Sequence, residues 1–472
     1  MKRFKRAIAL VAILVVASVA TFLLSRYEEK KEQIKSSDEI ILEIPSDTVT
    51  ALSWELEETS LAFHKGDEGW LYDEDEAFPV SEEKVNEILS YFEAFDVSFI
   101  IENVEDYDQY GLKDPEGIIH LTTTDSNYEI KLGNFSKMDE QRYVDIGDGN
   151  VYLVSKDPMN YIEEELSGMI KHDDTPKFDN VTDITFAGSE NYTIFYKEES
   201  SYSYHEEDIY FLEKDGKNLP LDTDTVSKYL KTITGLKLND YVTYNATEEE
   251  LESFGLNEPE LSVSINYTYT DEDEKEVSDS FLLHISQNPE ELKAAKDAVE
   301  KEKEEIPSVT KYARIGDSQI VYKITDSAYE TLAAASYNDF RHKEVIWADF
   351  DIVKQIDISL EGNNHTLTPS KNDGKDAETV WSYNEEEVDI DNLKTSLYNL
   401  MADSFTDEVP DQKQEIALTI HLDNENFPQV NIELYRYDGN SCLAVVDGKS
   451  VSLLERSAVM DLVEAVQAIV LN

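Results

Sequence analysis

The chain of 472 residues is long enough for about three domains of roughly 150 residues each. Hydrophobic residues make up 40% of it and aromatic residues 10%, which excludes a disordered chain although 30% of the residues are charged. The formal net charge is -60, so nucleic acid is excluded as a partner because phosphate binding needs a basic patch. We interpret the scattered acidic residues as a solvated surface that keeps an exported protein off anionic lipids and wall polymers. Weak binding of divalent cations or of a basic partner is the alternative.

The N-terminal residues 1–25 are predicted to be a membrane anchor or signal segment. A basic flank from Lys2 to Arg6 precedes an uncharged run from Ala7 to Leu24, which as a helix is about 27 Å long and can cross a membrane. The basic flank stays in the cytoplasm, so the rest of the chain is expected outside it. We expect an uncleaved anchor, with cleavage after Ala20 as the alternative. Residues 26–46 are predicted to be a charged linker.

Three copies of one pattern follow the linker. Each copy has an aromatic strand, an acidic turn, a short apolar pair around Pro79, Pro220 or Val388, and then a helix. Apolar residues three and four positions apart give each helix one apolar face. These residues are Val85, Ile88, Leu89 and Phe92 in the first helix, Val226, Tyr229, Leu230 and Ile233 in the second, and Leu393, Leu397 and Leu400 in the third. Ser81 and Asp222 are predicted N-caps.

Alternating strands and a closing hairpin complete each copy. The connections between strands are too short for crossover helices, which favours antiparallel pairing. The predicted fold class is therefore α+β, with an N-terminal transmembrane helix followed by three tandem, mainly antiparallel units at 47–172, 180–342 and 350–472. The second copy carries an insert at 287–311 that we expect to be a solvated, projecting helix, with a docking site for a partner as the alternative.

A short motif occurs in the first two copies, as YGLKDP from Tyr110 to Pro115 and FGLNEP from Phe254 to Pro259. A glycine after an aromatic residue and a proline four positions later suit a tight turn that starts the next strand. The motif offers no nucleophile, base or metal ligand, so we interpret it as scaffold.

These residues resemble a bacterial envelope family known as domain of unknown function 4340, in about three tandem copies. Copy one matches it at Trp70, Pro79, Tyr110 to Pro115, Leu132, Gly133, Tyr143, Val144 and Val151 to Leu153. Copy two matches at Pro220, Phe254 to Pro259 and Tyr312, and copy three keeps Trp381 and the closing hairpin but lacks the turn motif. The resemblance implies an anchored extracytoplasmic protein, often encoded near ABC-transporter components of the gliding-associated type. It implies no established activity.

No pattern in the sequence assigns a catalytic, cofactor-binding or metal-ligating residue, and no cofactor is expected. The histidines are dispersed and none has zinc-site spacing: His64, His120, His172, His205, His284, His342, His365 and His421. The lone Cys442 is expected to be a buried strand residue. The loop from Asp106 begins like a calcium-binding loop, but Tyr110 stands where a ligand is needed.

The leading functional hypothesis is a membrane-anchored, extracytoplasmic, non-enzymatic binding or scaffold protein. It would be an accessory of an ABC transporter or envelope complex in bacteria, with transporter permease or ATPase subunits as partners. One alternative is an exported hydrolase of wall glycan or peptide, which needs a buried acidic pair with a raised pKa in a cleft. Another is a cation-dependent adhesin. Ligand identity, oligomeric state and repeat packing stay open.

Overall fold

The computed structural model describes residues 13–23, 26, 33–57, 59–163, 165–199, 201–302, 305–371 and 379–471. Residues 13–23 of the predicted membrane segment are helical. The other residues of that segment lie outside the described residues. Within the described parts of the chain, no helix is long and apolar enough to cross a membrane. The chain divides into a first compact unit, Met1–Asp173, and a second, Asp174–Asn472.

The first unit contains one antiparallel sheet of 10 strands, which we call copy one. Its strand order is β1-β6-β10-β9-β8-β7-β3-β4-β5, with β2 paired to β6. The strands are β1 (Gln33–Ser36), β2 (Ile40–Leu42), β3 (Val49–Leu56), β4 (Ser60–Lys65), β5 (Trp70–Tyr72), β6 (Phe95–Glu102), β7 (Gly117–Thr123), β8 (Asn127–Ser136), β9 (Gln141–Asp145) and β10 (Val151–Val154). The helices are α2 (Glu82–Phe92) and α3 (Met159–Ile162), with 3-10 turns η1 (Ser46–Thr48), η2 (Asp108–Tyr110) and η3 (Leu166–Met169).

The predicted linker at 26–46 is partly a piece of this sheet. Its strands β1 and β2 both pair with β6. Pairing supplies partners for backbone groups that β6 would otherwise expose at the sheet edge. The short alternation of apolar and polar residues around Ile34 and Ile40 was too brief to predict these strands.

The second unit contains two antiparallel sheets of nine strands each, copy two and copy three. Copy two has the order β14-β13-β12-β11-β16-β17-β18-β19-β15, and copy three has the order β23-β22-β21-β20-β25-β26-β27-β28-β24. In every copy a helix separates a first meander from a strand (β6, β15 or β24) that pairs with the last strand of a second, four-stranded meander. This strand lies at the sheet edge in copies two and three, whereas β1 and β2 pair with β6 in copy one. All the strand pairs recorded within the described residues are antiparallel, as predicted.

The strands of copy two are β11 (Asn180–Ala187), β12 (Asn191–Tyr196), β13 (Tyr210–Lys214), β14 (Lys217–Pro220), β15 (Tyr241–Thr243), β16 (Leu261–Thr270), β17 (Glu276–Gln287), β18 (Lys311–Ile315) and β19 (Val321–Ile324). Its helices are α4 (Thr223–Thr234), α5 (Glu248–Ser253), α6 (Pro289–Glu300), α7 (Asp326–Ala333) and α8 (Tyr337–Phe340). Copy three has η4 (Phe350–Ile352), β20 (Val353–Leu360), β21 (Asn363–Lys371), β22 (Thr379–Tyr383), β23 (Glu386–Val388), α9 (Asp391–Tyr398), β24 (Ala402–Phe405), β25 (Gln414–Leu422), β26 (Gln429–Arg436), β27 (Ser441–Val446), β28 (Lys449–Glu455) and α10 (Arg456–Val470).

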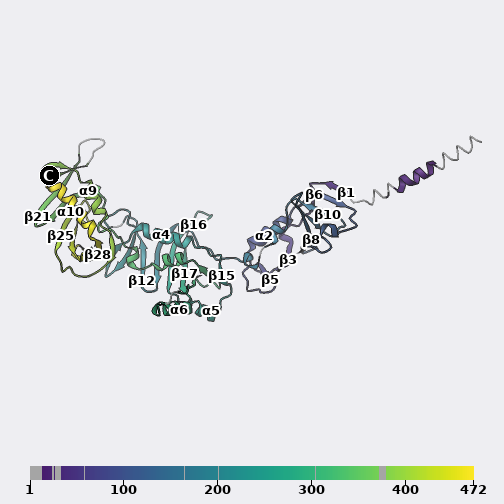
Figure 1. Ribbon diagram of the computed structural model, residues 1–472, viewed down its shortest axis with the longest axis horizontal. Helices are drawn as coiled ribbons and strands as arrows, with labels where there is room; N and C mark the ends of the chain where they lie inside the picture. Colours follow the sequence, from purple (N-terminus) through teal and green to yellow (C-terminus); the bar gives the residue numbers. More distant parts are fainter. Residues whose placement is uncertain are drawn as a thin grey trace, which may run out of the picture. The chain divides into compact units, whose positions relative to one another are not determined.

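Helices cover one face of each sheet in the second unit (Figure 1). The predicted apolar faces of the helices in copies one and two are confirmed, since all eight predicted residues are buried in α2 and α4. Burying such side chains contributes about 1.5–3 kcal/mol each. Ser81 and Asp222 are the N-caps, accepting hydrogen bonds from the backbone N–H of Lys84 and Thr225.

The insert of copy two differs in part from its prediction. Residues Pro289–Glu300 form α6, but Ala295 and Ala298 are buried, so the helix lies with one face packed and does not project freely. Small alanine side chains permit this close approach, and they made the apolar face look thin in the sequence.

The glycine turn motif is scaffold in both copies. Gly111 and Gly255 have φ of 71° and 73°, in the left-handed region that favours glycine. The preceding aromatic residue packs on a tyrosine of the closing hairpin, with ring centroids 4.9 Å apart for Tyr110 and Tyr143 and 4.8 Å apart for Phe254 and Tyr312. The turn therefore locks the start of the second meander onto its last hairpin.

One buried carboxylate ties copy two to copy three. Asp208 accepts hydrogen bonds from Ser203 Oγ, from His342 Nε2 at 2.9 Å and from Trp347 Nε1 at 3.0 Å. His342 and Trp347 lie on the segment between the two sheets, and their rings stack with centroids 4.1 Å apart. Burial alone would lower the pKa of His342, but hydrogen bonds to Asp208 and Glu344 outweigh it and raise the pKa to about 9. The pair is therefore ionic at neutral pH.

We predict that Gly111→Ala lowers the free energy of unfolding more than Gly147→Ala does. Both glycines have positive φ, which costs another residue about 1–2 kcal/mol. A Cβ at Gly111 would also lie 2.9 Å from the backbone nitrogen of Asn134, whereas Gly147 has no atom within 4 Å of that position. Denaturant titration measures both losses, and equal losses would contradict the steric role of the turn.

We predict that the free energy of unfolding of the second unit falls as the pH rises from 6.5 to 9.5. The folded pKa of His342 lies above the ordinary histidine pKa of 6.5, so its contribution to stability is complete below pH 6.5 and is lost as the pH passes about 9. A shift of this size corresponds to about 3 kcal/mol. Denaturant titrations of the wild type and of His342→Gln check this, because the difference between the two proteins should shrink with rising pH. A constant difference would overturn it.

Candidate functional site

The structure places three of the residues considered in the sequence in ordinary structural roles. Burial raises the pKa of the fully buried Cys442 thiol to about 11, so little thiolate forms at neutral pH. His421 Nε2 lies 2.8 Å from Asp357 Oδ2 on the third sheet. The Asp106 carboxylate accepts a hydrogen bond from the backbone N–H of Asp108 and so forms a local turn. Within the described part of the chain, no cluster of three or more His, Cys, Asp or Glu could hold a metal ion.

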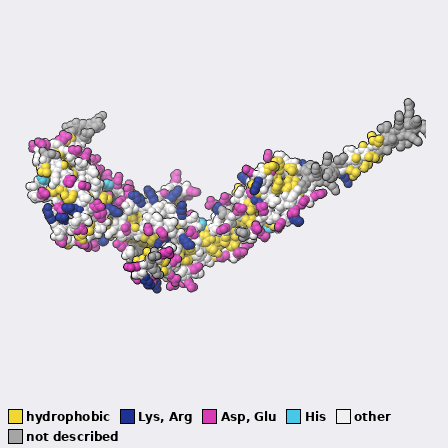
Figure 2. All heavy atoms as spheres, viewed as in Figure 1, with side chains coloured by type: hydrophobic (Ala, Val, Ile, Leu, Met, Phe, Trp, Pro, Cys, Tyr) yellow, Lys and Arg dark blue, Asp and Glu magenta, His cyan; other side chains and the backbone are white. Residues whose placement is uncertain are grey.

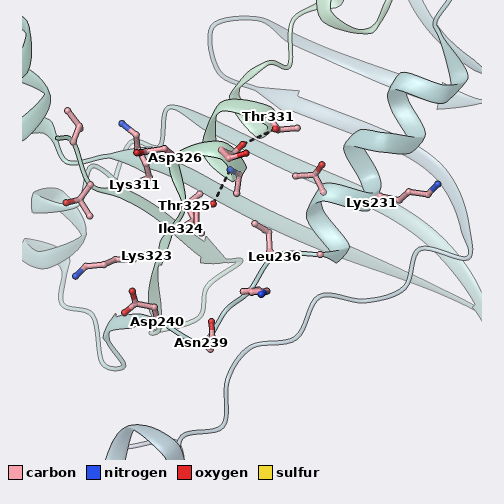
Figure 3. Close-up of a pocket in the computed structure, with 17 residues that line it drawn as sticks. Lys231, Leu236, Asn239, Asp240, Lys311, Lys323, Ile324, Thr325, Asp326 and Thr331 are labelled. Carbon is pink, nitrogen blue, oxygen red and sulfur yellow. Dashed lines mark hydrogen bonds between the residues drawn. The ribbon is translucent and has the colours of Figure 1, made fainter.

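A cavity of about 980 Å³ belongs to copy two (Figure 3). It lies where the closing hairpin β18–β19 meets the start of α7, and the end of α4 and the loop to β15 form its other side. We call it the copy-two hollow. The hydrogen bond from the Lys323 backbone N–H to the Asp240 carbonyl, 2.7 Å, holds that loop against β19.

Four lysines and two aspartates line the copy-two hollow: Lys231, Lys237, Lys311, Lys323, Asp240 and Asp326. In the whole chain acidic residues outnumber basic ones, by 101 to 41. Acidic side chains are spread over the visible surface (Figure 2). Lysines here outnumber acids two to one, so the hollow is an exception to the charge of the protein.

One carboxylate lies near two of these ammonium groups. The Thr310 backbone N–H donates to Glu291 and lowers the pKa of that carboxyl, and the nearby Lys311 and Lys323 lower it further. Among the described residues, no carboxylate forms an ion pair with Lys231, Lys237 or Lys323. Lys311 Nζ instead donates to Gln287 Oε1 at 2.6 Å and lies 5.1 Å from the Tyr329 ring centroid. Lys311 and Lys323 lie on one side of the hollow and Lys231 on the other, with Leu236 between them (Figure 3). The hollow thus has a positive rim.

Copies one and three have hollows beside the same closing hairpin, without the side that the end of α4 forms in copy two, and both are smaller and acidic. The copy-one hollow holds about 510 Å³ and contains Lys156 against Glu140 and Asp157. The copy-three hollow holds about 500 Å³ and contains Arg456 against Asp403 and Glu455. Copy two has therefore departed from the other two copies in both size and sign of charge.

In copy one, the cation at the hairpin position equivalent to Lys311 is paired with acids. Arg142 stands opposite Val154 in the closing hairpin, as Lys311 stands opposite Ile324. The Arg142 guanidinium is 7% exposed, and it lies 2.8 Å from Asp157 Oδ1 and 2.5 Å from Glu116 Oε2. The cation is internal to the fold in copy one, whereas in copy two it faces a cavity.

Chemically, the copy-two hollow can hold an anion. Lysine ammonium groups attract carboxylates, phosphates or sulfates, and a nearby low-dielectric wall strengthens the attraction. The mobile side chains and open rim suit a group presented by a larger partner. Sequence reasoning missed this site because its lysines are spread from 231 to 323. Comparing the three copies position by position would have revealed Lys323, since copies one and three have Leu153 and Leu453 there.

The model of the family described as Domain of unknown function (DUF4340) matches residues 70–208 and 214–419. The two segments include parts of all three sheets. No curated protein and no solved structure matches the chain.

We predict that Arg142→Met lowers the free energy of unfolding of the first unit by about 3–5 kcal/mol. Removing the guanidinium leaves Asp157, whose side chain is 12% exposed, as an uncompensated charge. The matched change Lys311→Met in copy two should cost less than about 1 kcal/mol, because Lys311 has no ion pair with a described carboxylate to break. Denaturant titration followed separately for each unit measures both effects. Similar losses would show that the two positions are equivalent after all.

Proposed function

The chain belongs to the DUF4340 family, and we propose that it is a membrane-anchored, extracytoplasmic protein that binds and positions envelope partners without catalysing a reaction. The partners that we propose are the permease of an ABC transporter and, through it, the ATPase.

The proposed location follows from the N-terminal sequence. Lys2, Arg3, Lys5 and Arg6 precede the uncharged run Ala7–Leu24, a pattern typical of a segment that inserts with its basic end in the cytoplasm. The acidic bulk that follows is well suited to an aqueous space beside anionic lipids, because like charges keep it from adhering to them. Attachment at one end would leave the repeated units free to meet neighbours in the same membrane.

The observation that carries the binding role is the copy-two hollow. The three copies share the order of their common strands, and among the three hollows of the described chain only that of copy two is lined by more cations than acids. Unpaired lysines contribute little to folding, but they attract an acidic surface and accelerate encounter with it. We therefore place the partner's acidic group in the copy-two hollow.

The pKa directions favour this proposal over an exported hydrolase. A glycan hydrolase needs a general acid with a raised pKa. Each described carboxyl group with a resolved shift has instead a lowered pKa, because hydrogen bonds hold its charged form: Asp208, Glu250, Glu291, Glu344, Asp357 and Asp438. These carboxylates serve as fixed anions inside their own loops and junctions.

Site-specific photo-crosslinking in native membranes tests the proposal. A photoreactive residue in place of Asn239, which lines the copy-two hollow, should capture a transporter permease. The same residue in place of Asn440, which lines the copy-three hollow, is the matched control and should not capture it.

Changing Lys231, Lys237 and Lys323 together to Gln should abolish the Asn239 crosslink while leaving the protein folded and membrane-bound. Equal crosslinking from Asn239 and Asn440, or crosslinking that survives the lysine changes, would refute a role for the hollow. Release of sugar or peptide fragments from purified wall by the wild-type protein would instead establish the hydrolase.

A further inference from the structure

A second cavity lies inside the second unit, between copies two and three. It holds about 390 Å³, within the range of small-molecule sites. Copy two contributes β14 and the segment around Tyr204, copy three contributes Phe427 and the turn between β27 and β28, and the connecting segment contributes Arg341 to Trp347. We call it the junction pocket.

One wall of the junction pocket is aromatic. Tyr204 packs against Trp347 with ring centroids 4.9 Å apart and against Phe427 at 6.0 Å. Leu219, Pro220 and Val430 add apolar surface around them. Tilted and edge-to-face rings of this kind provide apolar surface against which another ring or an apolar group of similar size can pack.

Arg341 supplies a positive charge that is not paired with a described carboxylate. Its guanidinium carbon lies 4.2 Å from the Phe405 ring centroid and 5.1 Å from that of Tyr337. Burial lowers the pKa of Arg341, and no carboxylate of a described residue pairs with it. Aromatic rings attract the charge of the guanidinium but offer no oxygen acceptor to its N–H groups, and the planar fork of these N–H groups suits a carboxylate. A half-buried arginine without an anion is costly, and a ligand anion would relieve that cost.

The other charges of the pocket leave a surplus of positive charge. Lys217 and Lys449 line it, and no described carboxylate pairs with either. Its two acids are already engaged within the protein. Glu344 Oε2 lies 3.8 Å from His342 Nδ1, and Asp447 Oδ1 accepts hydrogen bonds from the backbone and side-chain nitrogens of Asn431.

We propose that the junction pocket binds a carboxylate joined to an aromatic or similarly sized apolar group. The carboxylate pairs with the in-plane N–H groups of Arg341, and the apolar group packs on Tyr204 and Trp347. A free aromatic acid and the C-terminal aromatic residue of a peptide share this chemistry. The site is separate from the copy-two hollow, so this inference does not depend on the proposed function.

Calorimetric titration of the full-length protein in detergent tests the inference with three probes. 3-Phenylpropionate carries the ring and the carboxylate, 3-phenylpropionamide carries the ring without the charge, and acetate carries the charge without the ring. We expect 3-phenylpropionate to bind about ten-fold or more tightly than either of the others. N-acetyl-Ala-Ala-Phe distinguishes the sources, because tighter binding than 3-phenylpropionate assigns a peptide terminus and weaker binding assigns a free acid.

Three variants locate the binding. Arg341→Gln should weaken 3-phenylpropionate about ten-fold, and Arg341→Lys should give an intermediate loss because it keeps the charge without the planar fork. Lys296→Gln, on the exposed side of α6 and outside both cavities, should change nothing. If Arg341→Gln does not fold, the exposed pair Lys217→Gln and Lys449→Gln replaces it and should weaken binding several-fold. Equal affinity for acid and amide, no binding of the acid, or full affinity without the cations would overturn the proposal.

Discussion

Burial of one sheet face beneath helices is the interaction on which the second unit depends. In copy two, alternate residues such as Ile184, Val263 and Leu283 face the apolar sides of α4 and α7. The Tyr229 hydroxyl of α4 donates to the Leu332 carbonyl of α7 at 3.0 Å, which fixes the two helices against each other. Because the end of α4 and the start of α7 then meet the closing hairpin at one place, the fold creates a hollow there. Its position follows from topology, and its chemistry follows from the side chains that each copy supplies.

The sequence predicted the local features of this arrangement and missed the long-range ones. Helical periodicity identified Val85 and Val226 as core residues, and the spacing of aromatic residue, glycine and proline identified the tight turns at Gly111 and Gly255, because both arguments involve neighbours in the chain. The junction could not be predicted, since Asp208 and His342 lie 134 positions apart. Neither residue stands in a pattern that distinguishes it from other acids or histidines of the chain. The lysines of the hollow were hidden in the same way, since only the fold brings α4, β18 and β19 together.

In so acidic a chain, cations without an ion pair are unexpected. Where acids outnumber bases by 101 to 41, a lysine or arginine can easily find a carboxylate, as Arg142 does twice. The copy-two hollow and the junction pocket both hold cations without such a partner among the described residues. One is open and lined by flexible lysines, whereas the other is narrower and lined by aromatic rings. The same protein thus offers one surface suited to a macromolecule and one cavity suited to a small group.

The hydrogen bonds of the Asp208 carboxylate make copy two depend on the segment that follows it. Its partners come from a loop of copy two and from the connecting segment that leads into copy three, and Tyr204 beside it packs on the core of copy three. A duplication that ended after α8, or a deletion of copy three, would remove the apolar cover from this charge and its aromatic neighbours. Loss of copy three is therefore expected to destabilise copy two as well. In copy one, by contrast, the charge of Arg142 is balanced by acids of the same copy.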